Sequence, residues 1–195
     1  MKIILGSQSP RRKEILDFFS LPFSQIPANF DEDSLPFLGN PALHAITLSQ
    51  KKAEVLAEKF PGEIILTADT VVFFNGKLYN KPKCKKEAFE FLKAFSGNWQ
   101  QVITGVTLRC NEEIFSHHEE TKLLFNSLSD EQIHKFHNHC YALDKAGGFA
   151  IEKAGSLIIS KIEGSYDTVL GLPINAVHNL LLNFGINLWD YLKDL

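Results

Sequence analysis

Residues 64–82, IILTADTVVFFNGKLYNKP, decide the fold class of this chain. The β-rich run and the turn signal Asn75-Gly76 predict a long strand followed by a hairpin. Asp69 interrupts the apolar run, and a carboxylate in a buried strand is costly unless it is paired, hydrogen-bonded or bound to a cation. Asp69 is therefore a candidate for holding Mg²⁺ or activating water, the alternative being a structural Asp satisfied by backbone amides.

Strands alternate with helices on both sides of this hairpin, and residues 22–36 are rich in turn formers. The apolar patterns predict strands at 2–5, 63–74, 77–79, 101–109, 114–124 and 157–162. Cap signals and amphipathic spacing predict helices at 10–19, 41–60, 85–95, 129–141 and 173–184. This alternation predicts an α/β fold with a mixed sheet, and the absence of repeats or linkers predicts a single domain over residues 1–195.

The composition excludes several classes of protein. The chain has 195 residues, of which 45% are hydrophobic, so it can bury the core of one domain or of two small lobes. Its net charge of -3 argues against nucleic-acid binding, and its three cysteines form no CxxC pair that would hold a metal. No apolar run is long enough for a signal peptide or a membrane span, so we expect a cytoplasmic protein without a membrane or nucleic-acid partner.

The segment 5–16, LGSQSPRRKEIL, leads from the first strand into the first helix. Ser9 is the expected N-cap and Pro10 the first helical residue. Three cations follow in the first turn, where the helix dipole favours anions instead. Free backbone N–H groups together with the guanidinium groups of Arg11 and Arg12 suit phosphate oxygens, whereas the plain alternative is a capped helix with exposed arginines.

Five groups of residues lie in the order found in one known family. They are SQSPRR at 7–12, ADTVV at 68–72 with KP at 81–82, SG at 96–97 with VITGV at 102–106, DKAGGFAIE at 144–152, and GSYDTVLGLP at 164–173. With these motifs the chain resembles the Maf family of nucleoside triphosphate pyrophosphatases. The resemblance runs from residue 3 to about residue 185, and five motifs in order are far more specific than any one of them.

The resemblance implies an elongated α/β fold, with a mixed twisted sheet, flanking helices and two lobes around a deep central cleft, as in inosine triphosphate pyrophosphatases. It implies a hydrolase that converts a nucleoside triphosphate to the monophosphate and diphosphate with Mg²⁺ or Mn²⁺ as cofactor. It also implies a house-cleaning role against non-standard nucleotides, a link to cell division arrest, and a homodimer.

The family's functional residues carry over onto matching positions of this sequence. The resemblance makes Asp69 the catalytic proton acceptor and Glu32 its catalytic partner, both of them metal ligands. It assigns substrate binding to Ser7, Arg11, Arg12, Lys52 and Lys81. It assigns substrate specificity to Arg11, Thr70 and Glu152.

Glu152 departs from the pattern of the dTTP/UTP branch, which commonly carries Gln there. A carboxylate only accepts hydrogen bonds, which suits the N–H groups of guanine or 7-methylguanine, whereas an amide both donates and accepts. The surrounding motifs favour the dTTP/UTP branch, and a 7-methyl-GTP pyrophosphatase is the alternative. A non-catalytic nucleotide-binding regulator of cell division is a further alternative, although the chain retains both Asp69 and Glu32.

Overall fold

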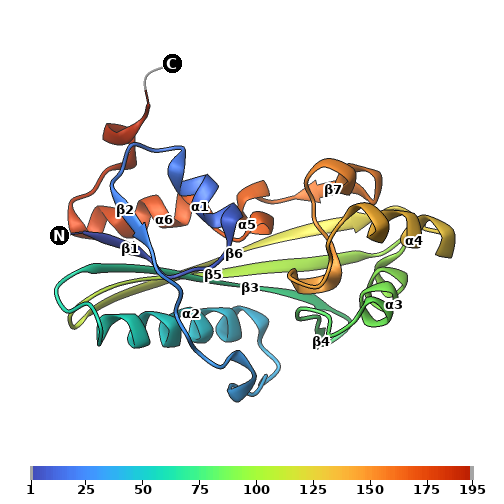
Figure 1. Ribbon diagram of the computed structural model, residues 1–195, viewed down its shortest axis with the longest axis horizontal. Coiled ribbons are helices and arrows are strands. Elements are labelled where there is room, and N and C mark those ends of the chain that lie inside the picture. The colour runs from blue at the N-terminus through green and yellow to red at the C-terminus, as the bar shows by residue number, and fades with distance from the viewer. Residues whose placement is uncertain (1, 194–195) are drawn as a thin grey trace.

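A computed structural model describes residues 2–193 of the chain. Its strands are β1 (Ile3–Leu5), β2 (Phe23–Gln25), β3 (Ile64–Phe74), β4 (Lys77–Leu78), β5 (Trp99–Cys110), β6 (Glu113–Phe125) and β7 (Ile159–Glu163). They form a seven-stranded sheet in the order β2-β1-β3-β5-β6-β7, with β4 paired to β3 beside this path (Figure 1). β1 runs parallel to β2 and β3, and the other pairs are antiparallel, so the sheet is mixed as predicted.

Helices cover both faces of this sheet. They are α1 (Pro10–Asp17), α2 (Pro41–Ala57), α3 (Lys85–Phe95), α4 (Asp130–His139), α5 (Tyr166–Leu170) and α6 (Ile174–Leu181). α2 packs on one face against β3 and β5, while α5 and α6 pack on the opposite face against β5 and β6 (Figure 1). None of the described helices is long and apolar enough to cross a membrane.

The long strands β3, β5 and β6 connect the two largest buried cores of the described residues, and two smaller clusters lie between α2 and the sheet. One core surrounds α1 and α6, and includes Leu16, Leu66 and Val177. The other lies beside α3 and α4, where the ring of Phe95 is 5.4 Å from that of Phe125. The molecule is accordingly elongated, with helices gathered at each end of the sheet (Figure 1).

The predicted hairpin after β3 is confirmed. Asn75 and Gly76 both adopt positive φ angles, of 46° and 79°, as a tight turn between two antiparallel strands requires. The turn reverses the chain so that residues 79–81 run back alongside the far end of β3. Tyr79 N–H donates to the carbonyl of Val72 at 2.8 Å, which holds this segment in place.

Two short elements are missing from the sequence prediction. Residues 22–36, predicted to be turn-rich, contain β2, whose three half-buried residues pair with β1. The motif at 164–173 contains α5, which has five residues and ends at Gly171 with a φ of 101°. Neither element is long enough to show a periodic pattern, so each depends on its tertiary partners to form. The helices expected at 41–60 and 173–184 also end earlier, at Ala57 and Leu181.

Candidate active site

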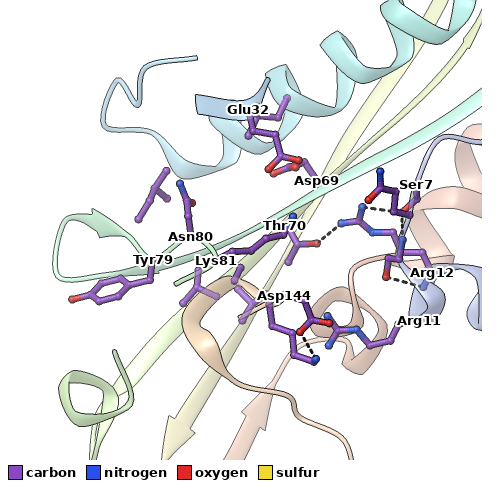
Figure 2. Close-up of a pocket in the computed structure, with 18 of the residues that line it drawn as sticks. Ser7, Arg11, Arg12, Glu32, Asp69, Thr70, Tyr79, Asn80, Lys81 and Asp144 are labelled. Carbon is purple, nitrogen blue, oxygen red and sulfur yellow. Dashed lines mark hydrogen bonds and ion pairs between the residues drawn. The ribbon is translucent and has the colours of Figure 1, made fainter. Parts of the chain in front are cut away.

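A cleft of about 1360 Å³ opens along β3 between the two cores. It is bordered by the first turn of α1, residues 28–33, one face of α2 and the segment 144–152. All nine residues predicted to form the site line it, namely Ser7, Arg11, Arg12, Glu32, Lys52, Asp69, Thr70, Lys81 and Glu152. Arg11 and Asp69 thus open onto one cavity, and Figure 2 shows them with the surrounding side chains.

The centre of the cleft is an ion-pair cluster. Nζ of Lys52 lies 2.5 Å from Oδ1 of Asp69 and 2.7 Å from Oε1 of Glu32. Lys52 and Asp69 are both buried. The ammonium group of Lys52 is therefore the ion-pair partner that a carboxylate inside an apolar strand requires. The carboxylates of Glu32 and Asp69 point toward each other in Figure 2.

Glu32 is held in its ionised form. Its burial acts to raise the pKa, but the charge of Lys52 and the hydrogen bond from it outweigh this effect, and Lys81 and Arg12 add to them. The pKa of Glu32 is therefore lowered from its ordinary value. At neutral pH this carboxylate is an anion available to a cation.

The sequence brings Lys52 to this position through the packing of α2. His44, Leu48 and Lys52 are spaced four residues apart on one helix face, and all three line the cleft. Gly105 lies opposite Asp69 in the register of β3 and β5. A Cβ atom at Gly105 would be 2.5 Å from the carbonyl carbon of Ala45, so only glycine allows α2 to approach the sheet this closely.

His44 is a cleft residue that sequence reasoning missed. It is buried, and its ring lies 5.6 Å from that of Phe37. Burial lowers the pKa of His44, with the charge of Asp69 opposing part of the effect, so the imidazole is neutral at neutral pH. Its eight-residue separation from Lys52, two turns along one helix face, is the signal that would have revealed it.

The guanidinium group of Arg12 forms hydrogen bonds to several segments that border the cleft. Its Nε donates to the carbonyl of Gly171 at 2.6 Å, and its Nη1 donates to the carbonyl of Ala68 at 2.8 Å. Its Nη1 and Nη2 also reach Oγ of Ser7 at 3.5 Å and Oγ1 of Thr70 at 3.0 Å. Four of the five guanidinium N–H groups are thus engaged, so in this arrangement Arg12 keeps one free N–H for the phosphate oxygens that it was expected to bind.

Ser7 and Ser9 shape the turn into α1. Ser9 is the N-cap, as predicted, and its Oγ accepts from the backbone N–H of Arg12 at 3.4 Å. The Oγ of Ser7 accepts from the backbone N–H of Ser9 at 3.0 Å and is buried at the floor of the cleft. The turn therefore presents a rigid polar surface to the cavity.

Arg11 and Glu152 lie next to each other at the border of the cleft. Nη1 of Arg11 lies 3.6 Å from Oε2 of Glu152, a charge contact longer than a hydrogen bond. Oε2 of Glu152 is buried and has no hydrogen-bond partner in the part of the chain that the structure describes. Arg11 therefore retains donors for a ligand, and Glu152 retains an acceptor.

The carboxylates of the ion-pair cluster suit a metal ion whose other ligands come from the substrate and water. Among residues 2–193, no group of three or more His, Cys, Asp or Glu side chains could hold a metal ion. Mg²⁺, however, is commonly bound through one or two carboxylates together with substrate phosphates and water. Glu32 and Asp69 provide such a pair, and the ammonium of Lys52 shows that a cation is stabilised between them.

The fold and the cleft define an α/β protein with a charged site suited to a phosphorylated ligand. The chain belongs to the Maf family, since the Maf-like protein model matches residues 2–184. A dTTP/UTP pyrophosphatase of Chlamydia caviae is 43% identical over 192 residues, which cover 98% of each chain. A dTTP/UTP pyrophosphatase of Thermosipho africanus is 42% identical over 186 residues, covering 95% of each.

The resemblance of the fold to one solved structure is distant. The Staphylococcus aureus Ham1 protein aligns over 94% of this chain and 97% of its own, with a TM-score of 0.49 and 14% identity. A likeness this distant does not bear on the chemistry of the cleft. The α/β architecture, with its mixed sheet and flanking helices, follows from the strand pairing itself.

Proposed function

We propose that this protein hydrolyses nucleoside triphosphates to nucleoside monophosphates and diphosphate. The observation that carries the proposal is the convergence of Lys52, Asp69 and Glu32 in the same cleft as the polar turn at the start of α1. Cleavage of a triphosphate needs charge stabilisation and positioning more than covalent chemistry, and this cleft supplies both signs of charge. Family membership and the names of the relatives support it.

The proposed cofactor is Mg²⁺ or Mn²⁺, held by Glu32 and Asp69. When bound, such an ion would neutralise phosphate charge and lower the pKa of a coordinated water. Lys52 now occupies the space between the two carboxylates. In the loaded enzyme we expect its ammonium to turn toward the phosphate oxygens, a short movement for a flexible side chain.

The proposed mechanism is an attack by water on the α-phosphorus. Asp69 accepts the proton of the water as its oxygen bonds to phosphorus, and the bond from phosphorus to the α–β bridging oxygen breaks. Diphosphate leaves with the bonding electron pair, and the cationic groups of Lys52, Lys81 and Arg11 stabilise its charge. Ser7 and the backbone of its turn position the phosphate chain, while Arg12 keeps that turn attached to β3.

We propose dTTP and UTP as substrates, on the strength of relatives named dTTP/UTP pyrophosphatase and of the motifs around the cleft. Glu152 favours a second candidate, a 7-methyl-GTP pyrophosphatase. Its buried, unbonded Oε2 only accepts hydrogen bonds, and guanine offers adjacent N–H donors. A substrate panel that includes 7-methyl-GTP distinguishes the two.

In the cell we propose a house-cleaning role against unwanted nucleotides in the cytoplasm, where nucleoside triphosphates are used. A homodimer and a link to cell division arrest belong to the same proposal. The elution volume of the purified protein with light scattering measures the first. Filamentation after overexpression, compared between the wild type and Asp69→Asn, measures the second and its dependence on catalysis.

The decisive experiment is a diphosphate-release assay over standard and modified nucleoside triphosphates with Mg²⁺ or Mn²⁺. The control is Asp69→Asn, which keeps the size of the side chain but removes its charge. Release by the wild type alone supports the proposal. Nucleotide binding without release from any substrate would instead identify a non-catalytic regulator.

A further inference from the structure

Glu32 reaches the ion-pair cluster from a segment that has few attachments to the rest of the protein. Residues 28–39 lie between β2 and α2 and loop out at the edge of the molecule (Figure 1). Among the described residues, the contact of Glu32 with Lys52 at 2.7 Å is the one hydrogen bond or ion pair that joins this segment to the rest of the chain. A cavity of about 420 Å³ lies between the segment, α2 and the β3–β4 hairpin. The backbone of the segment therefore does not fix Glu32 in place.

Local structure within the segment links the position of Glu32 to that of Phe37. The single helical turn Glu32–Ser34 is capped by the side chain of the residue before it. Leu35 is extended, with a φ of -98° and a ψ of 111°, as a residue before proline prefers, and the ring of Pro36 restricts its own φ. Because this short stretch is stiff, a displacement of Phe37 carries Glu32 with it.

Phe37 packs against the body of the protein. Its ring lies 5.6 Å from the ring of His44, at an interplanar angle of 85°, and 6.1 Å from the ring of Phe73. His44 belongs to α2 and Phe73 to β3, the elements that carry the other two members of the ion-pair cluster. Ring pairs in these arrangements are attractive. Leu38, by contrast, is 85% exposed, so the segment leaves the surface immediately after Phe37.

We propose that Phe37 is a positioning residue that keeps Glu32 in the ion-pair cluster, where Glu32 would hold the metal ion. The inference rests on the proposed function, in which Lys52 turns from Glu32 toward the phosphate oxygens of the loaded enzyme. The ion pair then no longer holds the segment, whereas the ring contacts of Phe37 remain. A site whose carboxylate is in place for only a fraction of the time binds its ion more weakly in proportion to that fraction.

The first measurement is the dissociation constant of Mn²⁺ in the presence of the α,β-imido analogue of UTP, which cannot be cleaved at the proposed bond. The electron paramagnetic resonance signal of free Mn²⁺ reports it, corrected for Mn²⁺ bound by the nucleotide alone. Phe37→Ala removes both ring contacts, so the constant should rise about tenfold. Phe37→Leu retains part of the apolar contact and should show a smaller rise. The matched control is Leu38→Ala, which shortens an exposed side chain of the same segment and should leave the constant unchanged.

A double-mutant cycle separates positioning from a general effect on packing. If Phe37 acts through Glu32, Phe37→Ala should cause no further rise in a Glu32→Gln protein, where the carboxylate is already lost. An equal rise in both backgrounds would overturn the proposal. So would an unchanged constant in Phe37→Ala when Glu32→Gln does weaken Mn²⁺ binding.

A measurement without metal separates this inference from the proposed function. Cleavage by glutamyl endopeptidase after Glu32, followed by mass spectrometry, requires the segment to leave the cluster, and its rate follows the fraction of open segment. Phe37→Ala should be cleaved there about tenfold faster than the wild type and Leu38→Ala. Equal rates would overturn the proposal even for an enzyme that releases diphosphate. Faster cleavage of Phe37→Ala, with Mn²⁺ binding that Glu32→Gln leaves unchanged, supports the positioning of Glu32 and contradicts only the proposed metal site.

Discussion

Nζ of Lys52, on α2, is 2.5 Å from Oδ1 of Asp69, in the middle of β3, and both groups are buried. This contact joins the helix on one face of the sheet to the strand that forms the floor of the cleft. It balances a charge that β3 would otherwise bury alone. The stability of the protein and its proposed chemistry therefore depend on the same pair of atoms.

Asp69→Asn should abolish diphosphate release while nucleotide binding persists. The amide cannot accept the proton of the attacking water, and a positioned base contributes roughly 10²–10⁴-fold to such a reaction. Single-turnover assays measure the chemical step, and calorimetry with a non-hydrolysable triphosphate measures binding. Turnover at the wild-type rate would remove Asp69 from the mechanism.

Lys52→Met should destabilise the fold by about 3–5 kcal/mol, because it leaves the carboxylate of Asp69 buried without a partner. Chemical denaturation measures the free energy of unfolding. The matched control is Lys51→Met, which removes an exposed pair with Glu54 at 2.7 Å and should cost less than about 1 kcal/mol. Equal losses in the two variants would show that Lys52 contributes only surface charge.

Gly105→Ala should destabilise the protein by about 1–3 kcal/mol, the usual effect of forcing an extra carbon into a packed interior. The added Cβ meets the backbone of Ala45, which cannot rotate away as a side chain can. α2 must shift, and Lys52 shifts with it, so kcat should fall as well. Wild-type stability and kcat would show that α2 tolerates the extra carbon.

The neutral state of His44 should make stability depend on pH. Burial lowers the pKa of His44 in the folded state, so below pH 6.5, its ordinary value, the unfolded chain binds a proton that the folded chain resists. The free energy of unfolding should therefore fall as the pH drops through this region. His44→Gln should flatten the slope. A slope identical to that of the wild type would contradict this role.

Glu152→Gln should shift the base preference toward dTTP and UTP. The amide both donates and accepts, as the O4 and N3–H groups of a pyrimidine require, and it removes a buried oxygen that lacks a hydrogen bond. Ratios of kcat/KM for dTTP, UTP and 7-methyl-GTP measure the shift, which we expect to be about tenfold. The same ranking before and after would exclude Glu152 from reading the base.

Much of the fold was predictable because its long elements carry strong local signals. β3 and its hairpin follow from β-branched residues and Asn75-Gly76, and α1 follows from Ser9 and Pro10. β2 and α5 were not predictable, since three and five residues show no period. β2 forms because β1 supplies partners for its backbone hydrogen bonds, and α5 forms because it packs against β5 and β6.

The sequence by itself identified nine of the side chains that line the cleft, and seven of them lie within continuous motifs whose local structure is set by nearby residues. It missed His44, which only the packing of α2 against the sheet brings into the cleft. Only the tertiary structure decided how those side chains are used. Arg12 bonds to Gly171, 159 residues away, and Lys52 on α2 pairs with Asp69 on β3. Such contacts depend on the packing of distant segments, which no local propensity encodes.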